Sequence, residues 1–293
     1  MTNVRGSSTG KVHLVGAGPG DPELLTLKAA AVLRGADLIL HDDLVPPAIL
    51  ALAGARTMLV NVGKRCGAKR ITQAEINKLM AESAGRGMNV VRLKSGDPGV
   101  FGRLAEELDA LAAAGIEPEI VPGVTAAAAA AASLGASLTD RRSSSRLLIV
   151  SWHHAKGVGS TTRHSANDPG ETIESADWRA IVADGTTIAV YMPGHEFAAL
   201  RKGLLEAGID AGTPAVIVSR ASTPEQQHYR TTIAGLDAVP ELRAPTMLLI
   251  GKTLERVGEG ISLFADPEAL PKSNELRGSS QKENAKGERS MTL

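Results

Sequence analysis

Three segments of the sequence combine glycine, proline and other small residues in the way that a close-fitting ligand site requires. They read GAGPGDP (residues 16–22), RLKSGDPG (residues 92–99) and PGVT (residues 122–125). Glycine lets the backbone approach a ligand closely, so the first two segments favour a nucleotide or nucleoside site. A dinucleotide fingerprint needs glycine where Asp21 stands, which argues against NAD and an oxidoreductase.

Two further segments offer groups that could move a proton or bind an anionic substrate. Asp42 and Asp43 follow an apolar run, and Asp42 is a candidate general base, although paired acids at such a position also cap turns. A cationic cluster comes next, and in a chain without net charge it suggests a carboxylate-rich or phosphate-rich substrate, with a solvated loop as the alternative. The cluster consists of Lys64, Arg65, Lys69 and Arg70.

The composition argues against several other classes of function. The 293 residues carry 32 Lys+Arg and 32 Asp+Glu, so no net charge draws the chain to nucleic acid or to an anionic membrane. Aromatic residues make up only 2% of the chain, too few for base-stacking platforms. The single cysteine, Cys66, excludes an internal disulfide, and the adjacent His153 and His154 lack metal-ligand spacing. We therefore expect no metal, no nucleic acid and no membrane as partners, and a cytoplasmic location.

The elements that must position these residues follow from the hydrophobic pattern. Short β-branched runs alternate with helical patterns, which predicts an α/β fold whose sheets are mainly parallel. A polar break at residues 139–146 separates an N-terminal lobe (11–138) from a C-terminal lobe (147–258), and the polar ends (1–10 and 259–293) are predicted to be disordered. Strands are expected at residues 12–16, 37–41, 57–62, 89–93, 117–121, 146–151, 187–192, 215–219, 228–232 and 246–251. Helices are expected at residues 23–34, 72–86, 101–114, 125–134, 176–183 and 196–207.

Seven motifs in order make the sequence resemble the tetrapyrrole methylases from about residue 11 to residue 257. Besides the three segments above, they are HDDLV (residues 41–45), VGKR (62–65), QAEIN (73–77) and FGR (101–103). The resemblance implies two α/β lobes with the active site in the cleft between them, a homodimer, and S-adenosylmethionine as the methyl donor. It also implies the transfer of two methyl groups to uroporphyrinogen III, which gives precorrin-2 for siroheme or cobalamin-type cofactors and leaves S-adenosylhomocysteine.

The resemblance also implies roles for individual residues. Asp42 matches the family's proton acceptor and Lys64 its proton donor. The cofactor contacts fall on Pro19, Ser95, Gly96, Asp97, Val100, Thr125, Ala126, Met192, Ala221, Pro245 and Thr246. The substrate carries many carboxylates, so five cations are expected to bind it: Arg65, Lys69, Arg103, Arg141 and Arg142.

Two alternatives keep the same fold. In the first, the protein methylates a later precorrin intermediate, because relatives with that activity have the SGDPG motif that stands here at residues 95–99. In the second, it binds a tetrapyrrole or cofactor without catalysis, because HDD stands at residues 41–43 where the family usually has YDR. Trials with the different tetrapyrroles separate the first alternative, and unchanged behaviour of Asp42→Asn is the mark of the second.

Overall fold

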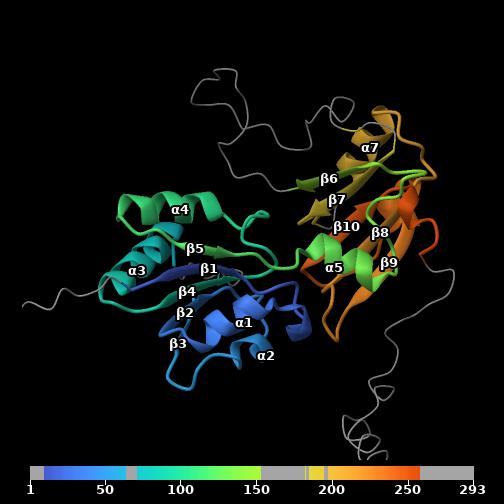
Figure 1. Cartoon of the computed structure of the whole chain (residues 1–293). Coiled ribbons are helices and arrows are strands. Elements are labelled where there is room, and N and C mark those ends of the chain that lie inside the picture. The colour runs from blue at the N-terminus through green and yellow to red at the C-terminus, as the bar shows by residue number, and fades with distance from the viewer. Residues whose placement is uncertain (1–9, 64–70, 153–181, 183–184, 195–196, 258–293) are drawn as a thin grey trace, which may run out of the picture.

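Two α/β lobes, each built on a five-stranded sheet, make up the structure (Figure 1). A computed structural model describes residues 10–63, 71–152, 182, 185–194 and 197–257. The predicted tail lies outside the described residues, as does the predicted leader apart from Gly10 and the helix expected at residues 176–183 apart from Val182.

The N-terminal sheet is parallel throughout and has the order β3-β2-β4-β1-β5. Parallel neighbours need long crossover connections, and helices supply most of them here. The five strands expected in this lobe are all present. They are β1 (Val12–Gly16), β2 (Leu38–His41), β3 (Met58–Asn61), β4 (Val90–Lys94) and β5 (Glu119–Val121). The helices are α1 (Leu27–Arg34), α2 (Pro47–Leu50), α3 (Gln73–Gly85) and α4 (Leu104–Ala113).

Helices cover both faces of this sheet, and alternate strand residues face opposite layers. In β4, Val90 packs in the cluster that contains residues of α3 and α4, whereas Val91 packs in the cluster that contains residues of α1 and α2. Side chains of a strand alternate with a period of two, so Arg92 and Lys94 point to the same side as Val90, toward α3 and α4. Two cations are therefore placed in an otherwise apolar layer.

Local capping decides where two helices begin. The predicted start of α3 is confirmed by a capping box, in which the Thr72 hydroxyl accepts from the Glu75 amide (3.2 Å) and the Glu75 carboxylate accepts from the Thr72 amide (2.6 Å). The helix expected at residues 23–34 is instead interrupted. Thr26 caps α1 by accepting from the Ala29 amide at 3.1 Å, and only a 3-10 turn, η1 (Pro22–Leu24), precedes it.

The C-terminal sheet has the order β6-β7-β10-β8-β9 and is mixed, where the sequence analysis predicts a mainly parallel one. Only β6 and β7 pair in parallel, and the other three pairs are antiparallel. A short connection joins β8 to β9, which pair antiparallel, and β10 then pairs antiparallel with the other side of β8. The strands are β6 (Arg146–Ser151), β7 (Thr186–Tyr191), β8 (Pro214–Ser219), β9 (Gln227–Thr232) and β10 (Thr246–Ile250).

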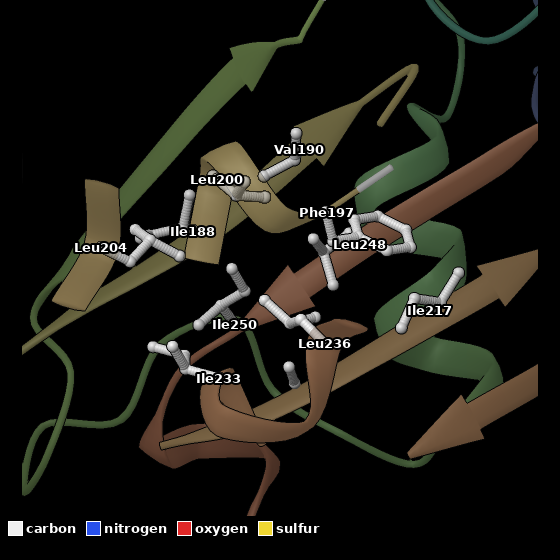
Figure 2. Packing of buried hydrophobic residues seen from close by; sticks show 11 residues of the cluster. Ile188, Val190, Phe197, Leu200, Leu204, Ile217, Ile233, Leu236, Leu248 and Ile250 are labelled. Carbon is white, nitrogen blue, oxygen red and sulfur yellow. The ribbon is translucent and has the colours of Figure 1, made fainter. Parts of the chain in front are cut away.

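One face of the C-terminal sheet is covered by α7 (Ala198–Glu206) and the 3-10 turn η3 (Ile233–Ala238). Figure 2 shows Leu200 and Leu204 of α7 packed beside Ile188 of β7. All side chains drawn there are hydrocarbon. The core of this face of the lobe is therefore formed by apolar packing.

The other face of the C-terminal sheet is covered by α5 (Ala126–Ser133) (Figure 1). Ala127 and Ala130 of this helix are fully buried in one cluster with Val218 of β8 and Leu249 of β10. The sequence analysis assigns α5 to the N-terminal lobe, but its packing partners belong to the C-terminal sheet. The chain therefore passes from the packing of one lobe to that of the other at residues 122–125.

Candidate active site

The three glycine-containing segments converge at the carboxyl edge of the N-terminal sheet, after β1, β4 and β5. A Cβ atom on Gly16 would lie 2.6 Å from the carbonyl oxygen of Gly96 and 2.6 Å from the amide nitrogen of Gly123. Gly18 and Gly96 exchange two backbone hydrogen bonds of 3.1 and 2.7 Å. Only glycine permits this close approach of three backbones, and it brings segments that are distant in the sequence together on one surface. Open α/β sheets bind ligands at this carboxyl edge.

The Asp97 carboxylate holds two of these segments together. Its Oδ1 accepts from the Gly99 amide at 2.8 Å, and its Oδ2 accepts from the Gly123 amide at 3.0 Å. Asp97, predicted as a cofactor contact, therefore also fixes the shape of the turns. Beside it Gly96 is buried with φ at +70°, yet a Cβ atom there would meet nothing within 4 Å. Open space thus borders this turn.

The C-terminal lobe brings four predicted cofactor residues to one end of its sheet. Met192 follows β7 and Ala221 lies just after β8, while Pro245 and Thr246 stand where the antiparallel β10 begins. The register pairs Thr246 with Ser219, so the ends of β8 and β10 coincide. These residues therefore share one edge.

This edge of the C-terminal sheet contacts the converging turns of the N-terminal lobe. The Tyr191 hydroxyl is hydrogen bonded to the Thr125 hydroxyl, and it accepts from the Ala127 amide at 3.2 Å. The Asp21 amide donates to the Ser222 hydroxyl at 3.3 Å. The structure thus places predicted cofactor residues from both lobes on facing edges that touch.

Unusual backbone conformations mark the same two edges. The described residues other than glycine that have a positive φ are Phe101, Arg103, Met192, Arg220 and Ser222, with values between 50° and 65°. All of them lie in the loop after β4 or just beyond β7 and β8. The Phe101 ring lies 5.1 Å from the Tyr191 ring, across the two edges. Such conformations persist only where the surroundings enforce them, and they cluster at functional sites.

Asp42, the predicted base, follows β2, and a buried arginine holds its carboxylate. Nη2 of Arg92 donates to Oδ1 of Asp42 at 2.5 Å, and the Asp42 side chain is 30% exposed. Nε of Arg92 donates to Oε1 of Glu107 at 3.1 Å, and Nζ of Lys94 donates to the same oxygen at 2.7 Å. The sequence analysis gives no role to Arg92, Lys94 or Glu107. The available signal was a pair of cations at alternate positions of an apolar strand.

The pKa of Lys94 reflects the buried position of its ammonium group. Burial lowers the pKa of Lys94 from its ordinary value, and the neighbouring Arg92 cation lowers it further. Glu107 raises the pKa of Lys94 by charge and by hydrogen bonding, but the direction remains downward. The carboxylate of Glu107 is therefore what makes two cations tolerable in this layer.

One predicted substrate-binding cation, Arg103, lies at the facing edges. It precedes α4 and donates to both carboxylate oxygens of Glu106, at 2.6 and 2.5 Å. The hydrogen bond to Glu106 is the main reason why the pKa of Arg103 is raised. The carboxylate of Glu106 thus already occupies Nε and Nη2 of this guanidinium. Lys64, Arg65 and Lys69 lie outside the described residues.

The other two predicted substrate-binding cations, Arg141 and Arg142, are not brought to this site. They lie in the turn before β6, which is tied to the first residues of β7 by a 2.7 Å hydrogen bond between Ser144 and Thr187. Met192 lies at the opposite end of that strand. Arg142 is paired with Asp140 at 2.7 Å.

Two surface hollows lie at the far ends of the sheets. One of about 290 Å³ is lined by residues that precede β1, β2 and β4, Lys11, Ala36 and Asn89 among them. Another of about 580 Å³ lies where β8 begins and β9 ends. Neither contains a predicted site residue. Within the described part of the chain, no three His, Cys, Asp or Glu side chains are grouped to hold a metal, and no helix has the length and apolarity to cross a membrane.

Fold and site together define a two-lobed α/β protein in which the edges of a parallel and a mixed sheet face one another. The chain belongs to the tetrapyrrole methylase family, because the family described as Tetrapyrrole (Corrin/Porphyrin) Methylases matches residues 11–237. The family and the fold class predicted from the motifs are thereby confirmed.

Individual relatives agree with this assignment. The chain is 42% identical over 261 residues to the uroporphyrinogen-III C-methyltransferase of Pseudomonas aeruginosa, covering 88% of this chain and 100% of that protein. It is 39% identical over 251 residues to the siroheme synthase of Pseudomonas paraeruginosa, covering 85% of this chain but only 51% of that longer protein. The uroporphyrin-III C-methyltransferase of Thermus thermophilus, solved in complex with S-adenyl homocysteine, matches with a TM-score of 0.67 and 36% identity over 84% of this chain and 99% of its own.

Proposed function

We propose that this chain is an S-adenosylmethionine-dependent C-methyltransferase that transfers two methyl groups to uroporphyrinogen III and so forms precorrin-2. The observation that carries the proposal is the meeting of the predicted cofactor residues of both lobes at the facing edges described above. The name of the P. aeruginosa relative supports the substrate, and the ligand of the T. thermophilus structure supports the cofactor. Siroheme synthesis as a whole is not part of the proposal, because the chain spans about half of the P. paraeruginosa siroheme synthase.

The residues at the facing edges fit S-adenosylmethionine. The glycine turns present backbone at close range, and open space lies beside Gly96. Phe101 and Met192 are 45% and 47% exposed, so they offer apolar surface to a nucleoside or thioether. Bound there, the cofactor supplies a methyl group that its sulfonium already activates, which leaves the protein to align the pyrrole carbon and to handle a proton.

The proton is the task of the chain's own side chains. Oδ1 of Asp42 is occupied by Arg92, while Oδ2 accepts no hydrogen bond from the described residues, so we assign Oδ2 as the proton acceptor. Lys64 is the proposed donor. Acid or base catalysis by such a group contributes roughly 10² to 10⁴ in rate. Arg103, with Arg65 and Lys69, is proposed to bind the substrate carboxylates, whereas Arg141 and Arg142 stay sequence predictions.

Assembly and location are further parts of the proposal. Family resemblance supports a homodimer, and light scattering on the purified protein tests it. A scattering mass of a single chain at micromolar concentration would contradict the dimer. The neutral composition and the single cysteine support a cytoplasmic location.

The test is anaerobic incubation of the protein with S-adenosylmethionine and uroporphyrinogen III, with the tetrapyrrole identified by absorbance and mass. The expected product carries two added methyl groups and is absent without the methyl donor. Unchanged uroporphyrinogen III, beside calorimetric binding of S-adenosylhomocysteine, would overturn the substrate. A later precorrin intermediate offered in the same assay would then identify the alternative substrate, and lack of turnover on both would leave a binding protein.

A further inference from the structure

Three charged side chains are buried in the N-terminal lobe and have no part in the proposed methyl transfer. Arg92, Lys94 and Glu107 are exposed to only 4%, 3% and 0%. Buried ion pairs are rarely the most stable way to fill a protein interior, because apolar side chains of similar volume avoid the cost of removing charges from water. The hydrogen bonds of these three side chains indicate a role for their charges.

The guanidinium of Arg92 is fixed from two sides before it reaches Asp42. Nε donates to Glu107, and Nη1 donates to the carbonyl oxygens of Leu40 at 3.3 Å and Leu93 at 3.1 Å. These partners belong to α4, β2 and β4, which are three separate elements of the lobe. The remaining corner, Nη2, donates to Oδ1 of Asp42. A planar guanidinium anchored in this way is held in one orientation.

Glu107 in turn is held by three donors on a single oxygen. Its Oε1 accepts from Arg92, from Lys94 and from Gln73 of α3, the last at 3.2 Å. Asp42 and Glu107 carry two negative charges against the two positive charges of Arg92 and Lys94, so the group has no net charge. Lys94 therefore compensates the charge of Glu107 while Arg92 is shared with Asp42.

We propose that Arg92 is a positioning residue for Asp42, and that Glu107 holds Arg92 in place for this purpose. The guanidinium fixes Oδ1 and thereby directs Oδ2 of Asp42 to the reacting pyrrole. This inference rests on the proposed role of Asp42 as the base. It assigns the buried charges of the lobe to catalysis, and it distinguishes Arg92 from residues that only support the fold.

The experiment is a double-mutant cycle between Arg92→Lys and Asp42→Asn. Lysine keeps the positive charge but has a single nitrogen, which cannot contact Glu107, the two carbonyls and Asp42 at once. We expect single-turnover methyl transfer to fall about 10- to 100-fold in Arg92→Lys, because a misplaced base loses rate of that order. The affinity for S-adenosylhomocysteine by calorimetry should stay within about twofold. The double variant should be no slower than Asp42→Asn alone, because Arg92 acts only through that carboxylate.

The outcomes distinguish the role of Asp42 as the base from the positioning role of Arg92. Full activity of Asp42→Asn would overturn the base, and the positioning role with it. A slow Asp42→Asn combined with multiplicative effects in the double variant would overturn the positioning role alone. Glu107→Gln, which keeps the shape of the side chain but removes its charge, provides a second cycle with the same expectation in case Arg92→Lys folds poorly. Arg201→Lys is the matched control, since its 3.0 Å pair with Asp237 lies on the C-terminal lobe, and it should leave turnover unchanged.

Discussion

The two lobes differ most in what they bury. In the N-terminal lobe the buried polar side chains include four that carry or can take a charge: His41, Arg92, Lys94 and Glu107. In the described part of the C-terminal lobe they are hydroxyls only: Ser144, Ser151, Thr187 and Ser219. Hydroxyls are satisfied locally, as in the 2.7 Å contact between Ser144 and Thr187. Buried charges need a network of hydrogen-bonded partners, and such a network can fix the position of a side chain in a functional site.

This contrast divides the chemistry between the lobes. The N-terminal lobe contributes charge, through Asp42 and the residues behind it, together with the glycine turns. The C-terminal lobe contributes shape, through an edge that rests on the hydrocarbon core of Figure 2. In the proposed mechanism the N-terminal lobe moves the proton, and this is the lobe that buries charged side chains.

The largest expected effect comes from removing the central charge of the N-terminal lobe. Glu107→Ala leaves the buried cations Arg92 and Lys94 with Asp42 as their remaining carboxylate, so one buried positive charge is uncompensated. We expect a loss of roughly 3–5 kcal/mol in the free energy of unfolding. Urea unfolding followed by circular dichroism measures it. Glu106→Ala is the matched control, because its partner Arg103 is 46% exposed and the pair is solvated. Equal losses in the two variants would remove the distinction between buried and surface charge.

A core variant of the C-terminal lobe should separate stability from catalysis. Leu204 of α7 is fully buried, so Leu204→Ala is expected to cost about 2–5 kcal/mol of unfolding free energy. Single-turnover methyl transfer, measured well below the unfolding temperature, should stay close to that of the parent protein. Leu205→Ala, at a half-buried neighbouring position, serves as control with a smaller cost. A drop in rate as large as that of Arg92→Lys would contradict the division between the lobes.

The contact between Tyr191 and the segment where the chain passes from one lobe to the other is expected to be worth less. Tyr191→Phe removes the hydroxyl that bonds to Thr125 and accepts from the Ala127 amide, and it keeps the ring beside Phe101. A lost hydrogen bond of this kind costs about 1 kcal/mol, and we expect a similar decrease in affinity for S-adenosylhomocysteine, about fivefold by calorimetry. Tyr229→Phe, on β9 and away from the facing edges, should bind as the parent does. Undiminished binding by Tyr191→Phe would mean that the contact is not used by the ligand.

Much of the architecture could be predicted from the sequence because its signals are local. All ten expected strands are present, since short β-branched runs between turn residues form strands in either kind of sheet. The capping box at Thr72 fixed the start of α3. The prediction of a mainly parallel sheet in the C-terminal lobe was wrong, because among the strands described there β6 and β7 alone pair in parallel. Strand direction depends on the connections between strands, and the composition of a strand does not indicate it.

The candidate site divides in the same way. The glycine-containing turns can be recognised from the sequence, and the structure brings Gly16, Gly96 and Gly123 together. The link from Glu107 through Arg92 to Asp42 joins residues of α4, β4 and the end of β2, which only the folded lobe brings within hydrogen-bonding distance. Packing of α5 on the C-terminal sheet likewise follows from tertiary contacts, because a run of alanines has no apolar face to predict its partner.

The smallest expected effect concerns the solvated pair of Asp140 and Arg142 near the start of the C-terminal lobe. Hydrogen bonding from the Arg142 side chain, with help from its backbone amide, lowers the pKa of Asp140 from 3.8 to about 2. A carboxyl whose pKa is lower in the folded protein stabilises the fold above its unfolded pKa, and this contribution disappears as the pH falls from about 4 through 2.

Arg142→Gln should therefore raise the pKa of Asp140 toward 3.8, as measured by carboxyl NMR titration. The urea midpoint at neutral pH should fall, because the stability contribution above about pH 4 depends on the lowered pKa of Asp140. The decrease should be small, because solvent screens an exposed pair. A midpoint lowered as far as in Glu107→Ala would show that a surface pair supports the C-terminal lobe as strongly as the buried charges support the N-terminal one. An unmoved pKa would show that the backbone amide of residue 142 alone holds the carboxylate. The expected pattern is a shifted titration with a small loss of stability. It contrasts with the large loss expected for Glu107→Ala, where the interacting charges are buried.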